Sequence, residues 1–231
     1  MRRFNTGNAQ QTFIKALCYG PSGAGKTVLS STAPEPERSF IVSAEGGTLS
    51  LSGVSLEGAH VDSMSATLEV YEWLIGSDEA KQFNFIHIDS ISEIAEYCLA
   101  EEMPKHKDGR QAYGAVQTRI KKLIRAFRDL PAHHVYMTAK QARVQDDQSR
   151  MYCAPDLPGS KLAASMPYWF DLVLAYRLNK TTDPETGEVK TTRALQCHGD
   201  ENYIAKDRSG KLDLFEPPHL GQIMKKIGVN Q

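Results

Sequence analysis

A glycine-rich run near the start of the chain has the residue types and the spacing of a phosphate-binding loop. Its positions follow the pattern G-x-x-x-x-G-K-[ST] and are Gly20, Pro21, Ser22, Gly23, Ala24, Gly25, Lys26 and Thr27. The glycines let successive N–H groups point toward one anion, and the N-terminus of a following helix adds a favourable dipole. We expect Lys26 to reach the outer phosphates of ATP and the Thr27 hydroxyl to bind the associated Mg²⁺ ion. The alternative is a glycine-rich turn with an incidental lysine.

The residues on either side predict the strand–loop–helix context that this motif requires. Residues 13–18 are apolar enough for a buried strand, and residues 27–31 can continue as a helix. Pro34 and Pro36 then end that helix, because proline lacks the backbone donor that the next turn needs. The local pattern therefore favours a true phosphate-binding loop.

Two later segments predict strands that end beside a carboxylate. The strand at residues 39–43 is followed by Glu45 and two glycines, and the apolar run at residues 83–90 carries Asp89 near its end. Ligands of open α/β sheets lie outside the carboxyl ends of the strands, so both carboxylates are placed near the expected phosphates. Asp89 fits a Walker B segment, whose aspartate holds Mg²⁺ directly or through water. We expect His87 to be a core histidine and not a ligand.

The rest of the chain predicts one α/β domain of residues 13–231 after a polar arm at residues 1–12. Apolar residues at helical spacing indicate helices at residues 66–76, 91–103, 115–130 and 219–227. Further strands are expected at residues 134–139, 170–176, 191–197 and 203–210. The predicted fold is a mostly parallel central sheet flanked by helices, with antiparallel strands toward the C-terminus. The stretch at residues 144–165 is polar and aperiodic, and we expect a functional or disordered loop there.

The composition limits the classes to which the chain can belong. A hydrophobic content of 41% and a charged content of 24% are ordinary for a globular protein. The formal net charge is −1, so any contact with nucleic acid must come from a local basic surface. We expect no membrane contact, because no apolar run is long enough to span a bilayer. The four cysteines lie far apart without a C-x-x-C pair, which favours a cytoplasmic location over zinc binding or disulfides.

Several of these segments, in this order, resemble the RecA superfamily of ATPases. The run IVSAEGG is similar to the RecA segment whose glutamate activates the attacking water, which implies that role for Glu45. The run IHIDSISEI resembles the RecA Walker B strand, including the serine that follows Asp89. The likeness extends from Phe13 to about Phe215. The chain is expected to lack the large terminal additions of cellular RecA. It is nearest to the RecA-like single-strand annealing proteins of bacteriophages, the fourth group of the Sak proteins, and it implies a RecA-like P-loop NTPase core.

The same resemblance implies two further parts of an ATPase site. The run YMTAKQ occupies the place of the strand that ends in the sensor residue, which would be Thr138, Lys140 or Gln141. The run AKDRSG is similar to the lysine-x-arginine element that reaches the nucleotide of a neighbouring subunit, which would use Lys206 and Arg208. The alternative for Lys206 and Arg208 is a charged hairpin, and for Glu45 it is a surface carboxylate before a turn.

The family likeness also implies partners. It implies a DNA-dependent ATPase that binds single-stranded DNA, promotes annealing or recombination as a homo-oligomer, and works with a single-strand binding protein in the host cytoplasm. The oligomer could be a ring or a filament. The candidate DNA contacts lie near residue 105 and in a long loop at residues 142–165, and they are Lys105, Lys107, Arg110, Arg143, Arg150, Tyr152 and Lys161. Two alternatives remain: a RecA-fold regulator or recombination mediator controlled by nucleotide, and a small-molecule kinase on another phosphate-loop fold.

Overall fold

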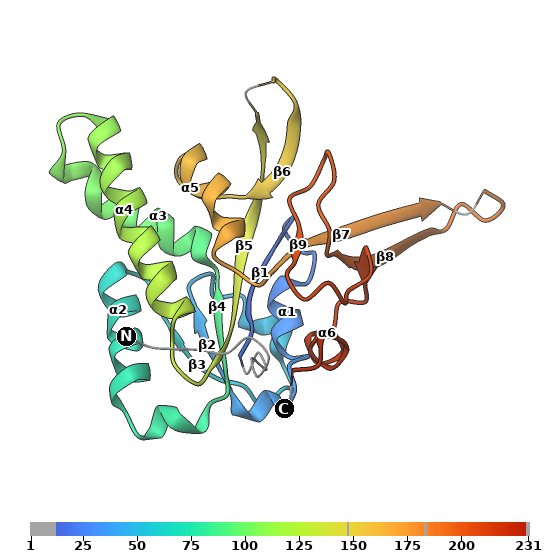
Figure 1. Ribbon diagram of the computed structural model, residues 1–231, viewed down its shortest axis with the longest axis horizontal. Coiled ribbons are helices and arrows are strands. Elements are labelled where there is room, and N and C mark those ends of the chain that lie inside the picture. The colour runs from blue at the N-terminus through green and yellow to red at the C-terminus, as the bar shows by residue number, and fades with distance from the viewer. Residues whose placement is uncertain (1–12, 147, 183, 230–231) are drawn as a thin grey trace.

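A central β-sheet with helices on both faces organises the chain (Figure 1). The computed structural model describes residues 13–146, 148–182 and 184–229, apart from the side chains of residues 160 and 161, so the predicted arm at residues 1–12 lies outside the described residues. The strands are β1 (Lys15–Gly20), β2 (Ser39–Ser43), β3 (Glu57–His60), β4 (Phe85–Asp89), β5 (His134–Gln145), β6 (Met151–Pro155), β7 (Leu172–Thr182), β8 (Val189–Gln196), β9 (Lys206–Asp207) and β10 (Phe215–Glu216). The α-helices are α1 (Lys26–Ser30), α2 (Met64–Gly76), α3 (Ile91–Glu102), α4 (Gly109–Arg128), α5 (Ser160–Ser165) and α6 (Leu220–Ile227).

The sheet is parallel at its centre and antiparallel toward the end of the chain. Its order is β10-β8-β7-β1-β5-β4-β2-β3, with β6 paired to β5 and β9 paired to β7. Strands β7, β1, β5, β4, β2 and β3 run parallel to one another, and β6, β8, β9 and β10 are antiparallel to their neighbours. This arrangement confirms the predicted fold class. It also brings the carboxyl ends of β1, β2 and β4 to one edge, where the predicted phosphate loop begins.

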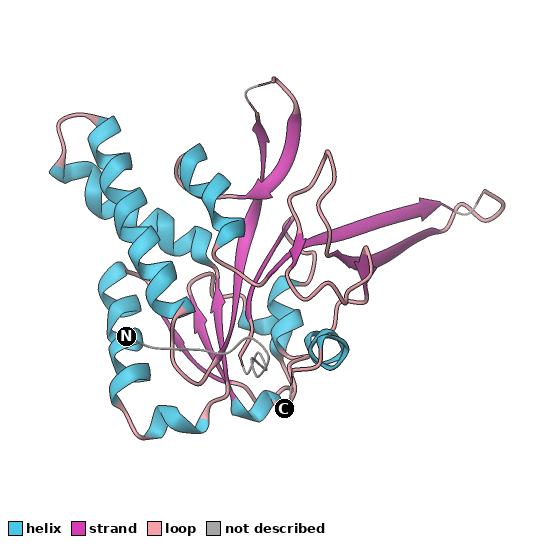
Figure 2. Ribbon diagram, in the orientation of Figure 1, coloured by secondary structure: helices cyan, strands magenta, loops and turns pink. Residues whose placement is uncertain are grey.

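Strand β1 shows why these sequences form a covered parallel sheet. Leu17 and Tyr19 pack into the core beneath α2, α3 and α4, whereas Ala16 and Cys18 pack into the core beneath α1 and α6. Figure 2 shows helices on both sides of the strands. Both faces of the strand are therefore buried, and such a strand reads as a continuous apolar run instead of an alternating one. This is the pattern that made residues 13–18 recognisable as a strand.

Side-chain caps determine where the longer helices begin. The Ser63 hydroxyl accepts a hydrogen bond from the Ala66 N–H before α2, and the Asp108 carboxylate accepts one from the Arg110 N–H before α4. The second cap corrects one prediction, because α4 starts at Gly109 and not near residue 115. Arg110 consequently lies in the first turn of a helix and not in a loop.

The predicted irregular loop at residues 144–165 is wrong. Strand β5 continues to Gln145 and pairs with β6 from Gln141↔Pro155 to Gln145↔Met151, and α5 follows. The hairpin rises away from the body of the sheet (Figure 1). Residues 153–155 at its base are buried but residues 141–145 are not, so no apolar period marks the segment. The predicted strand at residues 203–210 is also shorter than expected, because only Lys206 and Asp207 pair with β7.

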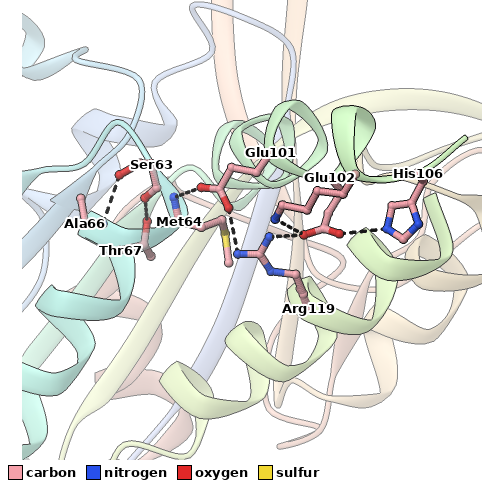
Figure 3. A network of polar contacts seen from close by, with 9 residues as sticks. Ser63, Met64, Ala66, Thr67, Glu101, Glu102, His106 and Arg119 are labelled. Carbon is pink, nitrogen blue, oxygen red and sulfur yellow. Dashed lines mark hydrogen bonds and ion pairs between the residues drawn. The ribbon is translucent and has the colours of Figure 1, made fainter. Parts of the chain in front are cut away.

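An ion-pair network joins the three helices on one face of the sheet (Figure 3). Arg119 of α4 contacts Glu101 at 2.9 Å and Glu102 at 2.6 Å, both on α3, and Glu101 accepts a hydrogen bond from the Met64 N–H at the start of α2. Lys105 and His106 also contact Glu102, and their hydrogen bonds lower the pKa of Glu102 to about 2. The network makes α2, α3 and α4 one unit, and it already uses the ammonium of Lys105.

Two structural details concern the predicted location. All four cysteines are buried and free of disulfide bonds. Within the described ranges, each helix is too short or too polar to cross a bilayer.

Candidate nucleotide-binding site

The phosphate loop connects the carboxyl end of β1 to the first turn of α1. Gly23 and Gly25 have φ angles of +71° and +113°, a region that glycine enters without the clash of a Cβ atom. Gly20 is needed for a different reason, because a Cβ there would lie 2.7 Å from the Cβ atom of Tyr176. The strand–loop–helix context of the motif is therefore present, and each glycine has its own steric cause.

The loop forms one wall of a cavity of about 450 Å³, called here the nucleotide cavity. Its lining comprises Gly20, Pro21, Ser22, Gly23, Gly25, Lys26, Thr27, Val28, Glu45, Ser50, Lys140, Gln141 and Asp156. The Lys26 ammonium donates to the carbonyl oxygens of Gly20 and Pro21, each at 3.1 Å. These neutral acceptors hold the ammonium over the loop, where phosphate oxygens are its natural charged partners.

Asp89 accepts hydrogen bonds from two hydroxyl groups, one at the end of the phosphate loop and one on β5. The Thr27 hydroxyl donates to Oδ2 of Asp89 at 2.5 Å, and the Thr138 hydroxyl of β5 donates to Oδ1. Asp89 is 3% exposed. A buried carboxylate and a threonine hydroxyl side by side are hard oxygen donors of the kind that Mg²⁺ accepts beside nucleotide phosphates. The residues present therefore fit a phosphate-bound Mg²⁺ ion.

Glu45 lines the same cavity and is held by the end of β4. The Ala44 and Glu45 N–H groups donate to the Asp89 carbonyl at 2.7 and 3.3 Å, and the Ser90 hydroxyl donates to the Glu45 carboxylate. Glu45 itself is exposed to solvent and lines the cavity. Both carboxylates lie at this edge of the sheet, Asp89 buried and Glu45 exposed to solvent.

The three candidate sensor residues occupy different positions. Thr138 is fully buried, and its hydroxyl donates a hydrogen bond to the Asp89 carboxylate instead of facing the cavity. Lys140 lines the cavity and pairs with Glu93 of α3, and this hydrogen bond raises the pKa of Lys140. Gln141 also lines the cavity, and its Oε1 atom is buried without a hydrogen-bond partner among the described residues. Of the three, Gln141 alone carries an unused polar atom.

A second hollow of about 490 Å³ lies on the other side of Gln141, at the base of the β5–β6 hairpin. It is lined by Gln141, Arg143, Met151, Tyr152, Cys153, Arg177, Asp200, Asn202 and Tyr203. The Arg177 guanidinium lies 3.7 Å from the centre of the Tyr203 ring, and Asp200 accepts hydrogen bonds from the N–H groups of Asn202 and Tyr203. The hollow thus combines two arginines with two tyrosines.

The structure brings together only some of the predicted DNA contacts. Arg143 and Tyr152 share the second hollow. Lys107 and Arg110 are exposed near the junction of α3 and α4, where Lys105 pairs with Glu102. Arg150 pairs with Asp146 within the turn of the hairpin, and Lys161 belongs to α5 with its side chain outside the described set. Sequence reasoning missed Arg177 and Tyr203, since neither stands in a motif and only strand pairing brings them to the hollow.

Lys206 and Arg208 lie at the opposite end of the sheet from their own phosphate loop. The Lys206 ammonium donates to the carbonyls of Pro167 and Phe170 at 2.9 and 2.8 Å. Burial lowers the pKa of Lys206, and the positive charge of the nearby Arg208 lowers it further. Arg208 pairs at 2.6 Å with Asp171, whose second oxygen accepts from the backbone at the start of β1. These residues do not reach the nucleotide cavity of their own chain, so action on a neighbour's nucleotide stays a prediction.

The comparison with known families agrees with this geometry. The family described as the AAA domain matches residues 12–209, which is most of the chain. The chain belongs to the AAA domain family. Membership makes it a P-loop NTPase domain, and the phosphate-binding segment predicted at residues 20–27 lies within the matched range. No curated protein matches the chain.

Proposed function

We propose that this AAA domain is a Mg²⁺-dependent ATPase that binds single-stranded DNA and promotes annealing or recombination as a homo-oligomer. The observation that carries the proposal is the position of Gln141, which lines both the nucleotide cavity and the arginine- and tyrosine-containing second hollow. A ligand in either cavity would therefore lie next to the same side chain. The resemblance to phage RecA-like annealing proteins supports DNA as the second ligand and a single-strand binding protein as a partner.

The groups around the nucleotide cavity would supply the phosphate cradle, the metal ligands and the water-orienting carboxylate of an ATPase. The loop N–H groups and Lys26 would hold the phosphates, and Thr27 with Asp89 would hold Mg²⁺, which neutralises charge on the β- and γ-phosphates when bound. A magnesium ion beside a nucleotide usually keeps several waters and is bound by one or two carboxylates together with the phosphates. Glu45 is accessible to water and would orient the attacking molecule.

The second hollow has the chemistry of a single-strand site. Arg143 and Arg177 can pair with backbone phosphates, and Tyr152 can stack on a base, whereas one face of the Tyr203 ring is covered by Arg177. Stacking is worth about 1–3 kcal/mol per base and tolerates any sequence. Because the chain has a net charge of only −1, a local basic hollow of this kind is what DNA binding requires.

The Oε1 atom of Gln141, which has no hydrogen-bond partner among the described residues, would couple DNA binding to ATP binding. A buried acceptor without a donor costs about 1–3 kcal/mol, so the side chain gains by turning toward a donor in either site. Ligand in one site would then change the hydrogen bonding available in the other. Reciprocal coupling of DNA and ATP affinity follows from linkage.

Assembly would complete the site. Lys206 and Arg208 face away from their own nucleotide cavity, and contact with a neighbouring copy would bring positive charge to the γ-phosphate of that copy. An arginine supplied in this way typically raises turnover about 10³–10⁵-fold. Hydrolysis would therefore depend on oligomer formation.

The test is ATP turnover measured with and without single-stranded DNA. We expect the wild type to be stimulated by DNA and Lys26→Ala to be inactive. Gln141→Ala and the double variant Arg143→Ala/Arg177→Ala should each lower the ratio of stimulated to basal turnover. Lys190→Ala, which removes an exposed charge outside both cavities, is the matched control and should keep the ratio.

Other outcomes separate the alternatives. Turnover that ignores DNA but responds to a partner protein would replace the proposal with a nucleotide-controlled regulator. Transfer of the γ-phosphate to a metabolite would replace it with a small-molecule kinase. Turnover unchanged in Lys26→Ala would reject the nucleotide site itself.

A further inference from the structure

We propose that Tyr176 and Arg193 are positioning residues of the phosphate loop. Both lie at the base of the hairpin formed by β7 and β8, which extends away from the sheet (Figure 1). Neither belongs to the G-x-x-x-x-G-K-[ST] motif, and the sequence placed them only in predicted strands, at residues 170–176 and 191–197. The inference rests on the proposed function only in requiring that the cavity binds ATP.

Tyr176 lies under both ends of the loop. A Cβ atom on Gly20 would come within 2.7 Å of the Tyr176 Cβ, and one on Gly25 within 2.9 Å of the Tyr176 hydroxyl. Tyr176 is only 4% exposed, so it is a firm surface and not a mobile side chain. The tyrosine therefore occupies the space that the two glycines leave, and it sets how far the loop can sink toward the sheet.

Arg193 acts on a single peptide unit of the loop. Its Nε atom donates to the Ala24 carbonyl at 3.2 Å. In a planar trans peptide the carbonyl of one residue and the N–H of the next point in opposite directions. Holding the Ala24 carbonyl on the hairpin side therefore directs the Gly25 N–H away from the hairpin, and Gly25 lines the nucleotide cavity.

The conformation of Gly25 makes this contact important. With φ at +113°, Gly25 has access to several backbone conformations, and rotation of the Ala24–Gly25 peptide would turn the N–H out of the cavity. Phosphate recognition by such loops depends on N–H groups that already point at one anion. Tyr176 limits this rotation from below, and Arg193 holds its carbonyl end.

The test is equilibrium binding of MgATP and MgADP to the full chain. We expect Arg193→Ala to weaken both nucleotides about tenfold, because hydrogen bonds from charged groups contribute modestly at exposed positions. Arg193→Lys should recover part of the affinity. Tyr176→Phe keeps the ring beneath the loop and should bind close to wild type, whereas Tyr176→Ala should bind more weakly. Lys190→Ala removes a charge from the same strand without touching the loop and is the control.

Two readouts distinguish positioning from a general charge effect. The loss in Arg193→Ala should persist at high salt, because a change in backbone orientation is not screened as a distant charge is. Hydrogen exchange at the Gly25 amide should be faster in Arg193→Ala than in Lys190→Ala. A loss that disappears at high salt would overturn the proposal, as would wild-type affinity and wild-type exchange in Arg193→Ala.

Failure of the nucleotide site itself would look different. In that case the wild type and Lys26→Ala would bind MgATP equally poorly. If Tyr176→Ala does not fold, which its thermal unfolding curve would show, the Arg193 variants alone decide the outcome.

Discussion

Replacing Thr138 by valine tests how Asp89 is held ready for its ion. The Thr138 hydroxyl donates to the Asp89 carboxylate, and both residues are buried, Thr138 completely and Asp89 to within 3%. Valine has nearly the same shape as threonine, so the substitution removes the donor without opening a cavity. One oxygen of a buried carboxylate then loses its partner.

The size of the effect follows from that geometry. A hydrogen bond to a charged group contributes about 1.5–3 kcal/mol, and burial of both partners leaves little screening by water. We expect Thr138→Val to lower the free energy of unfolding by about 2 kcal/mol. For a domain of this size, that corresponds to a fall in Tm of about 4–8 °C.

A matched control is available in helix α2. Thr67 is also completely buried, and its hydroxyl donates at 2.8 Å to the Ser63 carbonyl, which the Thr67 N–H already contacts. Thr67→Val leaves that neutral acceptor with a donor, so it should cost about 0.5–1 kcal/mol. The two variants are compared by denaturant and thermal unfolding at neutral pH.

Equal destabilisation of the two variants would refute the reasoning. It would mean that the contact between Thr138 and Asp89 adds nothing beyond an ordinary buried hydroxyl. A loss of ATP turnover without any loss of stability would instead assign Thr138 a direct role at the nucleotide.

Three further predictions concern catalysis, assembly and acid stability. Glu45→Gln, which can still accept the Ser90 hydrogen bond, should lower turnover about 10²–10⁴-fold with MgATP affinity retained; equal turnover would remove Glu45 from catalysis. Arg208→Ala should lose turnover and regain it when mixed with Lys26→Ala, and mixed oligomers that stay inactive would count against action in trans. Burial lowers the pKa of His87 to about 3, below the unfolded value of 6.5. The unfolded chain therefore binds a proton more readily than the folded one, so the folded state loses stability as pH falls from 6.5 toward 3. His87→Leu should therefore reduce the loss of stability between pH 7.5 and pH 5, by up to about 2 kcal/mol in unfolding titrations, and an unchanged loss would place the acid sensitivity elsewhere.

The sequence predicted a phosphate loop and two carboxylates near it because the relevant signals are local. A phosphate loop depends on glycines and a lysine at set spacing, and the flanking strand and helix lie next to it in the chain. Asp89 and Glu45 could be placed because each follows an apolar run, and the ends of parallel strands meet at one edge. His87 was correctly expected in the core, where it stacks on Phe85.

The sensor candidates show where local reasoning stops. Thr138, Lys140 and Gln141 are separated by one or two positions, and successive side chains of a strand alternate between faces. Only the tertiary structure puts Thr138 behind Asp89 and puts Gln141 between the two cavities. The hairpin of β5 and β6 was missed for a related reason, since it depends on strand pairing and only residues 153–155 of its paired positions are buried.

The sequence by itself therefore determined which chemical groups are present, and in which short segments they can act on a phosphate. The fold decided which distant residues contact those segments. Tyr176 and Arg193 contact the phosphate loop although each is more than 150 positions away in the chain. Such contacts arise from the order and register of strands across the sheet. These depend on the packing of the whole core, and no short stretch of residues encodes them.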